Sequence, residues 1–342
     1  MGRDSDDRLL LGGIGINSNH KKKVQERIKE KSFLSSFNFD NTDGPRFHYT
    51  SPEGLIGILK TRTFFFTDSQ FLNDFREKIN INEELDWFWE FHKKEYEKDF
   101  YKLLSSIRVT QYEDSGFSYL DSRTERACRY FVLSLSMAGD SLSMWKYYSK
   151  TGDYNGYCLG LVSYALTDEW IDRITGAAVI ASKVEYYSED KQEIIAGVVA
   201  RLYSIWQSYE RSALLDEKVI KEFTSWISVE ALFFKDQCFE DERETRYVAI
   251  VPTDMLKDMY YEYNGNKFKM YDFRIVNGML VPYIKMPFND WNKDVCWAIK
   301  SIRIGPSGNA EQKEAGLKQF VHSLDYEFEN CAILKSNIPV RY

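Results

Sequence analysis

The chain has 342 residues, 44% of them apolar and 16% aromatic, and carries a formal net charge of −7 at pH 7. It is long enough for one large domain or two ordinary ones, and this composition favours a packed globule over a disordered chain. Proteins that bind nucleic acid through its phosphates normally carry a basic face. The net acidity weakens that class of function, without excluding an enzyme that contacts nucleic acid briefly.

The cysteines and the apolar stretches indicate the compartment. The sequence contains five widely spaced cysteines and no CxxC pair, which is typical of reduced thiols and gives no zinc signature. No apolar stretch approaches the roughly 20 residues of a membrane helix. The acidic residues before Leu9 argue against a secretory signal. We therefore expect a cytoplasmic protein with no bound metal and no membrane partner.

The first half of the chain alternates strand and helix patterns. Residues 1–45 are expected to form a polar N-terminal extension with a helix at 21–37. A strand at 46–50 is followed by Ser51 and Pro52, the N-cap and first-turn residues of a short helix at 53–60. Further predicted elements are a strand at 63–67, one or two helices within 77–107, a strand at 130–136, and a helix from an Asp140 cap through Tyr148.

The second half adds more strands around a long helical block. The expected strands are 156–162, 177–187, 245–251, 268–270, 279–284, 297–304 and 332–336, and the expected helices are 163–171, 310–322 and most of 191–234. Strands separated by two helical blocks predict one α+β domain over residues 46–342. The helical insertions are expected at about 77–126 and 188–235.

Three segments carry polar or aromatic groups that a core pattern does not require, and the first is the strand around His48. His48 is one of four histidines and lies in a strand beside a turn, where its ring can face a ligand hydroxyl with Thr50 next to it. A hydrogen-bonded structural histidine is the alternative.

The second segment is SLSMAGDSLSMWKYY, residues 134–148. A strand that ends in small hydroxyl residues such as Ser136 leads into a helix with Trp145, Tyr147 and Tyr148, whose flat rings can stack on a heteroaromatic ring. By spacing alone, Trp145 and Tyr148 are better explained as core anchors, which is the alternative.

The third segment is the acidic run from Glu240 to Arg246. If the following strand has already begun, Glu242, Glu244 and Arg246 point to one face. Such a carboxylate, kept ionised by Arg246, could act as a general base or hold a hydroxyl group. A solvated charged turn is the alternative.

Read in order, these segments resemble a bacterial family catalogued as a domain of unknown function, number two-nine-seven-one. The residues that carry the resemblance are FHYTSPEGLIGILKTRTFFFTDSQFLND, FVLSLS, SMWKYY, NGYCLGL, EDERETRYV and IKSIRIGPSGNAEQKE. The resemblance covers roughly residues 46–342. Because the function of that family is poorly defined, this resemblance does not assign an activity.

A looser resemblance is to the ADP-ribosyltransferase fold, in the branch that uses a His, a Tyr and a Glu. It implies a mixed β-sheet core and NAD as the substrate, without a metal. His48, with Tyr49 and Thr50 alongside, matches the His that contacts the adenosine-side ribose. Trp145, Tyr147 and Tyr148 are candidates for stacking on nicotinamide, and Glu244 or Glu242 for holding the nicotinamide ribose and promoting departure of nicotinamide.

The order of the three segments leads to the hypothesis of an NAD-dependent ADP-ribosyltransferase or NAD-cleaving enzyme of a bacterial toxin or phage-defence type. The acceptor would be a protein or a nucleic acid, and a phage or defence-system protein would be a partner. The alternative is a non-enzymatic sensor that binds a nucleotide or a protein. A nucleic-acid-processing enzyme is a third interpretation.

Overall fold

The computed structural model describes residues 46–72, 77–109, 119–120, 127–148, 154–162, 178–263, 266–288, 298–324 and 331–339. The strands are β1 (Arg46–Thr50), β2 (Thr63–Asp68), β3 (Tyr119–Leu120), β4 (Ala127–Ser136), β5 (Tyr157–Leu161), β6 (Ala178–Lys183), β7 (Glu244–Pro252), β8 (Tyr260–Tyr263), β9 (Asn266–Lys269), β10 (Tyr271–Val276), β11 (Met279–Pro287), β12 (Ile299–Ile304) and β13 (Ala332–Lys335). The α-helices are α2 (Pro52–Thr61), α3 (Glu77–His92), α4 (Lys98–Leu104), α5 (Leu142–Tyr148), α7 (Ser188–Ser208), α8 (Ala213–Glu230) and α9 (Ala310–His322), and the short 3₁₀ helices are η2 (Ser69–Phe71), η3 (Gln237–Glu242) and η4 (Leu256–Asp258).

Helices and strands combine as an α+β fold with one large mixed sheet, which confirms the fold class expected from the sequence. The sheet has the strand order β10-β11-β2-β4-β1-β5-β12-β13; β3 and β7 also pair with β4, and β6 pairs with β7. The sheet is mixed because β12 and β13 run parallel, whereas the other pairs are antiparallel. β8 and β9 form a separate two-stranded sheet.

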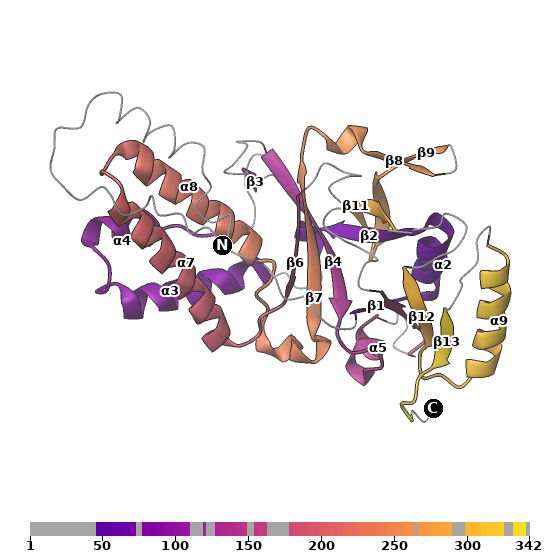
Figure 1. Ribbon diagram of the computed structural model, residues 1–342. Coiled ribbons are helices and arrows are strands. Elements are labelled where there is room, and N and C mark those ends of the chain that lie inside the picture. Colours follow the sequence, from indigo (N-terminus) through magenta and orange to yellow (C-terminus); the bar gives the residue numbers. More distant parts are fainter. Residues whose placement is uncertain are drawn as a thin grey trace, which may run out of the picture.

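Strand β4 is the point where this sheet branches. One edge of β4 pairs with β7 over almost its whole length, from Cys128 to Ser136. The other edge pairs with β3 at the start of the strand, then with β2 at Phe131 and Val132, and then with β1, only at Ser136. In Figure 1, β2 and β11 lie to the right of the upper part of β4, and β1 and β12 lie to the right of its lower part. Residues 133–135 of β4 therefore lie between two diverging strands.

The connection from β1 to β2 forms as its capping signals predict. The Ser51 hydroxyl accepts a hydrogen bond from the Gly54 amide at 3.2 Å, and Pro52 occupies the first turn of α2. Arg62, with a left-handed φ of 53°, ends the helix. Leu55, Ile58 and Leu59 of α2 are buried in the main sheet core. The N-terminus of α2 is therefore fixed next to the end of β1.

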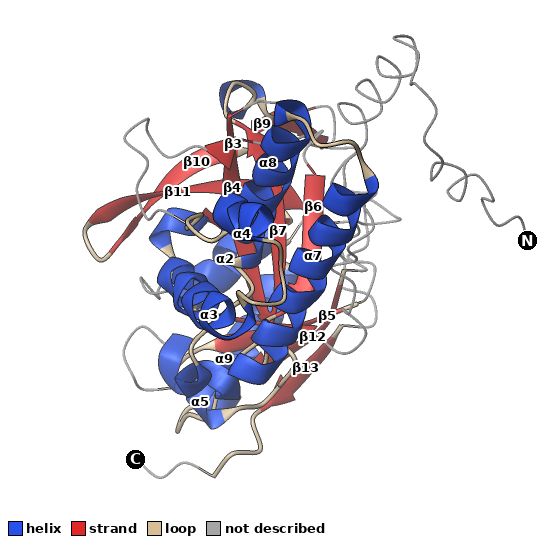
Figure 2. Ribbon diagram, turned by 90° about the vertical axis from the view of Figure 1, so that its left-hand side faces the viewer, coloured by secondary structure: helices blue, strands red, loops and turns tan. Residues whose placement is uncertain are grey.

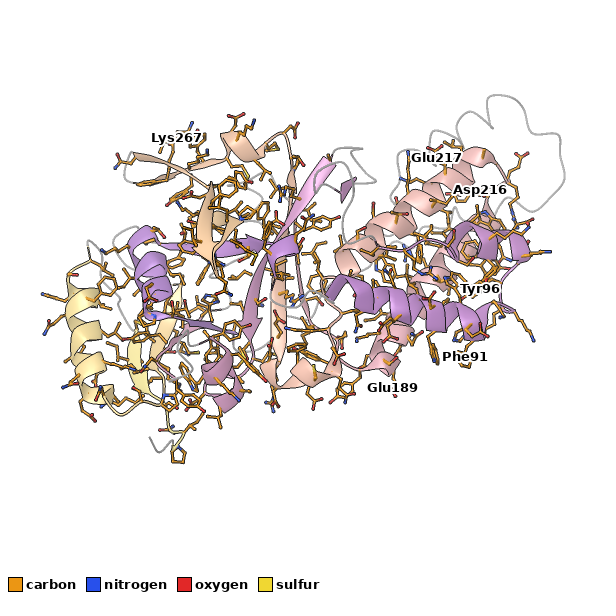
Figure 3. The ribbon with its side chains drawn as sticks, turned by 180° about the vertical axis from the view of Figure 1, so that it is seen from behind. Phe91, Tyr96, Glu189, Asp216, Glu217 and Lys267 are labelled. Atoms are coloured by element: carbon orange, nitrogen blue, oxygen red, sulfur yellow. The ribbon has the colours of Figure 1, made fainter. Side chains whose placement is uncertain are left out.

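The four helices α3, α4, α7 and α8 pack around a hydrophobic core of their own beside the branched sheet (Figure 2). Leu202 of α7 and Phe223 of α8 are fully buried in it. In Figure 3, Tyr96 and Phe91 both lie in this helical region, away from the strands. Tyr96 packs edge-to-face against Tyr203 of α7, whereas Phe91 is 62% exposed.

Several predicted boundaries need correction. The predicted helices at 21–37 and 163–171 lie outside the described residues. The helical block predicted over 191–234 is two helices, α7 and α8, and a predicted strand at 268–270 is replaced by two strands, β9 and β10. Helix α5 begins at Leu142, and the Asp140 carboxylate accepts a hydrogen bond from the Trp145 indole at 2.8 Å. A short polar side chain near a helix start can cap the helix or bind another side chain, so the sequence alone does not distinguish these two roles of Asp140.

Truncating Leu202 to Ala tests the helical core. Leu202 is fully buried, so its loss removes apolar contacts and leaves a cavity, and we expect a loss of about 2–5 kcal/mol in the free energy of unfolding. Urea unfolding followed by circular dichroism measures the change. The matched control is Leu142→Ala, at a leucine that is 47% exposed. Equal stability of the two variants would contradict the packing described for α7.

Candidate functional site

A cavity of about 520 Å³ opens where β1 and β2 diverge from β4. This volume lies within the range of about 300–1,000 Å³ that is common for small-molecule sites. Among the residues predicted from the sequence, His48, Tyr49, Thr50, Ser136, Tyr147, Tyr148, Glu242 and Glu244 line it. These residues come from three distant segments of the chain, and the fold brings them to one place. Two further predicted residues, Trp145 and Arg246, do not line the cavity.

His48 faces the gap between the two diverging strands. Its Nδ1 lies 3.3 Å from the carbonyl oxygen of Ser134, in the part of β4 that lacks a β1 or β2 partner. A carbonyl only accepts, so Nδ1 carries the proton and Nε2 is left as an acceptor. Burial lowers the pKa of His48 to about 4; the bond to Ser134 opposes this shift and the charge of Arg274 adds to it. His48 is therefore neutral at pH 7.

Glu244 opens β7 and is held by a set of donors that fills its carboxylate. Arg246 donates from Nε to Oε1 at 2.8 Å and from Nη2 to Oε2 at 2.9 Å. Lys235 donates to Oε2 at 3.2 Å, and the Ser134 side chain donates as well. A carboxylate offers roughly four lone-pair sites, and these four donors occupy them. Burial opposes ionisation of Glu244, but the charges of Arg246 and Lys235 outweigh it and lower the pKa to about 2.

Glu242 is the second carboxylate of the cavity wall, and it retains acceptor capacity. Its Oε2 accepts one hydrogen bond from Lys235 at 2.7 Å, and within the described residues its Oε1 has no donor. Burial raises the pKa of Glu242, and the positive charge of Lys235 opposes that shift. Of the two carboxylates, Glu242 is the one with lone pairs left for a ligand hydroxyl.

The backbone around the two carboxylates differs from the predicted alternation. Glu242 ends the 3₁₀ helix η3, Arg243 adopts a left-handed φ of 44°, and the strand starts only at Glu244. The strand therefore starts one residue before the expected 245, and the condition under which Glu242 would share a strand face with Glu244 and Arg246 is not met. The left-handed turn at Arg243 still allows both carboxylates to reach Lys235, and the prediction that Glu244 and Arg246 share a face of the strand is confirmed.

Sequence reasoning missed Lys235, which lies between the two carboxylates. Lys235 follows the buried residues Phe233 and Phe234, and it is itself only 5% exposed. A lysine at the end of an apolar run is a signal that could have been used, because a buried ammonium group needs a carboxylate partner. Tyr186 was missed as well; its hydroxyl accepts a hydrogen bond from the Glu244 amide at 2.9 Å.

Three of the predicted site residues have their polar atoms engaged within the protein. The Tyr49 hydroxyl donates to the Ala138 carbonyl at 2.7 Å and accepts from the Ser141 amide at 3.0 Å. The Ser136 hydroxyl donates to the Glu242 carbonyl at 2.6 Å, which fixes the position of Glu242. Trp145 is 1% exposed and packs edge-to-face on Tyr49. Because Trp145 is buried, its ring has no exposed face on which a ligand could stack, in agreement with the alternative that Trp145 is a core residue.

The remaining predicted residues present rings or hydroxyls at the cavity wall. Tyr147 is 56% exposed, and both Tyr147 and Tyr148 line the cavity from α5, which packs against η3. Thr50 ends β1; a Cβ added at Gly54 would lie 2.1 Å from its Oγ1, so a larger residue at position 54 would force the Thr50 hydroxyl to move. Aromatic rings next to Glu242, with His48 beyond them, suit a ligand that carries a ring and sugar hydroxyls.

Comparison of the chain with protein-family models, with curated proteins and with solved structures gives no match in any of the three. In the part of the chain that the structure describes, no group of three or more His, Cys, Asp or Glu side chains could hold a metal ion. No helix among the described residues is long and apolar enough to cross a membrane. Function is therefore inferred from the chemistry of the cavity.

The neutral state of His48 predicts a pH effect on stability. The histidine pKa is about 6.5 in an unfolded chain and about 4 in the folded one. Below pH 6.5 the unfolded chain binds a proton that the folded chain does not, so stability falls as the pH drops from about 6.5 towards 4. We expect a smaller loss between pH 7 and pH 5 for His48→Asn, whose amide can still donate to Ser134. Urea unfolding at both pH values gives the comparison, and equal losses would contradict it.

Replacing Lys235 by Met should strongly destabilise the protein. The change leaves Glu242 buried without its cation, at an expected cost of about 3–5 kcal/mol in the free energy of unfolding. The double variant Lys235→Met/Glu242→Gln should recover part of that loss. The control is Lys318→Met, which removes an i,i+4 pair between the exposed Lys318 and Glu314 worth less than about 1 kcal/mol. If the two lysine variants unfold at the same urea concentration, the ion pairs described between Lys235 and the carboxylates of Glu242 and Glu244 are contradicted.

Proposed function

We propose that this protein is an NAD-dependent ADP-ribosyltransferase or NAD-cleaving enzyme, with NAD as its substrate in the cavity between β1, β2 and β4. One observation carries the proposal: eight residues chosen from three separate sequence segments line a single cavity. The kinship with domain family two-nine-seven-one and a toxin or phage-defence role rest on the sequence resemblance, and they are part of the same proposal.

The arrangement of the wall supports a nicotinamide ribose bound beside Glu242. Tyr147 and Tyr148 supply aromatic faces for the nicotinamide ring at this end. Since no described residue donates to it, Oε1 of Glu242 can accept a hydrogen bond from a ribose hydroxyl. His48 Nε2 can accept one from the other ribose, because Nδ1 is held by Ser134.

In this proposal the two carboxylates have different tasks. Glu242 acts on the sugar, and Glu244 is a positioning residue. Glu244 has its lone pairs filled by Arg246, Lys235 and Ser134, so it holds Lys235 in place next to Glu242. This assignment refines the expectation from the sequence, which named Glu244 first and Glu242 second.

The reaction itself balances without a metal or a protein nucleophile. The bond between C1′ of the ribose and the nicotinamide nitrogen breaks, and nicotinamide leaves with the electron pair. Positive charge develops on the sugar and is stabilised by the Glu242 carboxylate. An acceptor hydroxyl or amine, or water, then bonds to C1′ and releases a proton. The acceptor can be a protein, a nucleic acid or a small molecule.

A second candidate is a protein that binds the nucleotide without turnover. One observation favours it: Lys235 and Arg246 already compensate the two carboxylates of the wall, which weakens their field at a developing cation. A binder would show a higher melting temperature with NAD or ADP-ribose, because a ligand selective for the folded state stabilises it. It would release no nicotinamide.

Incubating the purified chain with NAD labelled in the adenylate and a cell lysate distinguishes these functions. We expect release of nicotinamide and transfer of label, and a loss of at least about 100-fold in rate for Glu242→Gln because the carboxylate is what stabilises the transition state. Glu244→Gln should lose less, provided that it stays folded. Asp241→Asn, at an exposed acid of the same run, is the matched control and should keep the wild-type rate.

The proposal fails if the wild-type protein neither releases nicotinamide nor transfers label. The assignment of the sugar contact to Glu242 fails separately, if Glu242→Gln turns over NAD as fast as Asp241→Asn while Glu244→Gln is inactive and folded.

A further inference from the structure

A guanidinium group that the sequence patterns did not single out, that of Arg274, lies at the cavity wall opposite the carboxylates. Arg274 belongs to β10 and pairs with Val281 of β11. The β10–β11 hairpin contributes Arg274, Val276 and Asn277 to the lining. Arg274 donates from Nη2 to the Thr67 hydroxyl of β2 at 2.8 Å. The hairpin therefore holds a cation over the part of the cavity bordered by β2.

Arg274 has no carboxylate partner among the described residues. Its described contacts are the Thr67 hydroxyl and the face of the Tyr283 ring, with the guanidinium carbon 5.5 Å from the ring centroid. Its Nε is buried without an acceptor. The nearby acid Asp272 is bound to Lys285 at 2.6 Å. A partly buried guanidinium group that lacks an anion is costly, and its planar fork of donors fits phosphate oxygens.

The other charges of the wall balance one another. Glu242 and Glu244 are paired with Lys235 and Arg246, so these four groups add no net charge. His48 is neutral, with its pKa lowered to about 4 by burial and further by the charge of Arg274. Among the described residues of the wall, Arg274 is consequently the positive charge without a compensating anion, which favours an anionic ligand.

Strand β4 sets the distance between this cation and the carboxylates. Along β4, Val132 pairs with Thr67, His48 contacts Ser134, and Ser136 pairs with Glu244. Four residues of a strand cover about 13 Å. A ligand that reaches from Glu242 to Arg274 is thus an extended molecule with a ring and ribose at one end and an anionic group farther along.

We propose that Arg274, supported by Thr67, is the phosphate-binding residue of this cavity and holds the diphosphate of an adenine nucleotide. The inference rests on the proposed function for the identity of that nucleotide and deepens it by naming the diphosphate contact. The same site binds inorganic pyrophosphate more weakly, because that ion lacks the base and sugar.

Isothermal titration calorimetry of the full chain with ADP-ribose, ADP, adenosine and inorganic pyrophosphate tests the site. Wild-type protein should bind ADP-ribose and ADP at least about tenfold more tightly than adenosine, as a charged hydrogen-bond pair is lost with the phosphates. Arg274→Gln should weaken ADP-ribose and ADP by about tenfold or more and leave adenosine unchanged. Arg274→Lys, which keeps the charge without the fork, should fall between them.

The matched control is Arg211→Gln, which removes an exposed arginine of the helical region that pairs with Glu97. It should bind all four probes as the wild type does. Wild-type affinity for ADP-ribose in folded Arg274→Gln overturns the proposal, and so does a wild type that prefers adenosine or binds none of the probes. If Arg274→Gln does not fold, unchanged ADP-ribose affinity in Arg274→Lys overturns it.

The outcome is separate from that of the proposed activity. ADP-ribose binding that depends on Arg274, without release of nicotinamide from NAD, keeps the phosphate site and removes the enzyme. If the wild type releases nicotinamide and Arg274→Gln keeps full activity and full affinity for ADP-ribose, the enzyme is kept and the phosphate site is removed.

Discussion

Strand β4 uses its two edges unequally, and the candidate site follows from that. β7 covers one edge almost completely, whereas β2 and β1 share the other edge and diverge between Val132 and Ser136. A strand interior left without a neighbour has backbone groups that need other partners. His48 supplies one of them through its bond to the Ser134 carbonyl. The same contact sets the tautomer of His48 and leaves Nε2 as an acceptor. The hydrogen bond that satisfies the Ser134 carbonyl thus also leaves an acceptor atom on a residue that lines the cavity.

Counting hydrogen-bond capacity separates the residues that build the cavity from those that can contact a ligand. Tyr49 and Ser136 line the wall, yet their hydroxyls hold the turn after β4 and the backbone of Glu242. Glu244 is filled by its donors, whereas Glu242 is not. All of these residues line the cavity, so their position alone does not distinguish those that can bind a ligand from those that cannot. Counted over the residues that the structure describes, the hydrogen bonds leave acceptor atoms on Glu242 and His48.

Helices and strands whose signals lie in neighbouring residues of the chain could be predicted from the sequence. The Ser51 and Pro52 cap of α2 and the apolar run of β4 depend on neighbours in the chain, and both were predictable. Lys235 and Arg274 were not assigned to the site, because their partners come from elements distant in the sequence. The sequence also did not separate a stacking Trp145 from a buried one, since the same helical spacing serves both.

The helical region takes part in the site rather than being attached to it. The residues after α8 carry Lys235 to the carboxylates, and the Lys235 amide donates to the Glu185 carbonyl at 3.1 Å. Lys191 of α7 donates to the Lys235 carbonyl at 2.8 Å, so a helix also holds this backbone segment. Any shift of α7 or α8 relative to β7 would move the ammonium group between Glu242 and Glu244. Because a buried carboxylate depends strongly on its cation, the charge available at the Glu242 end of the cavity is coupled to the packing of the helices.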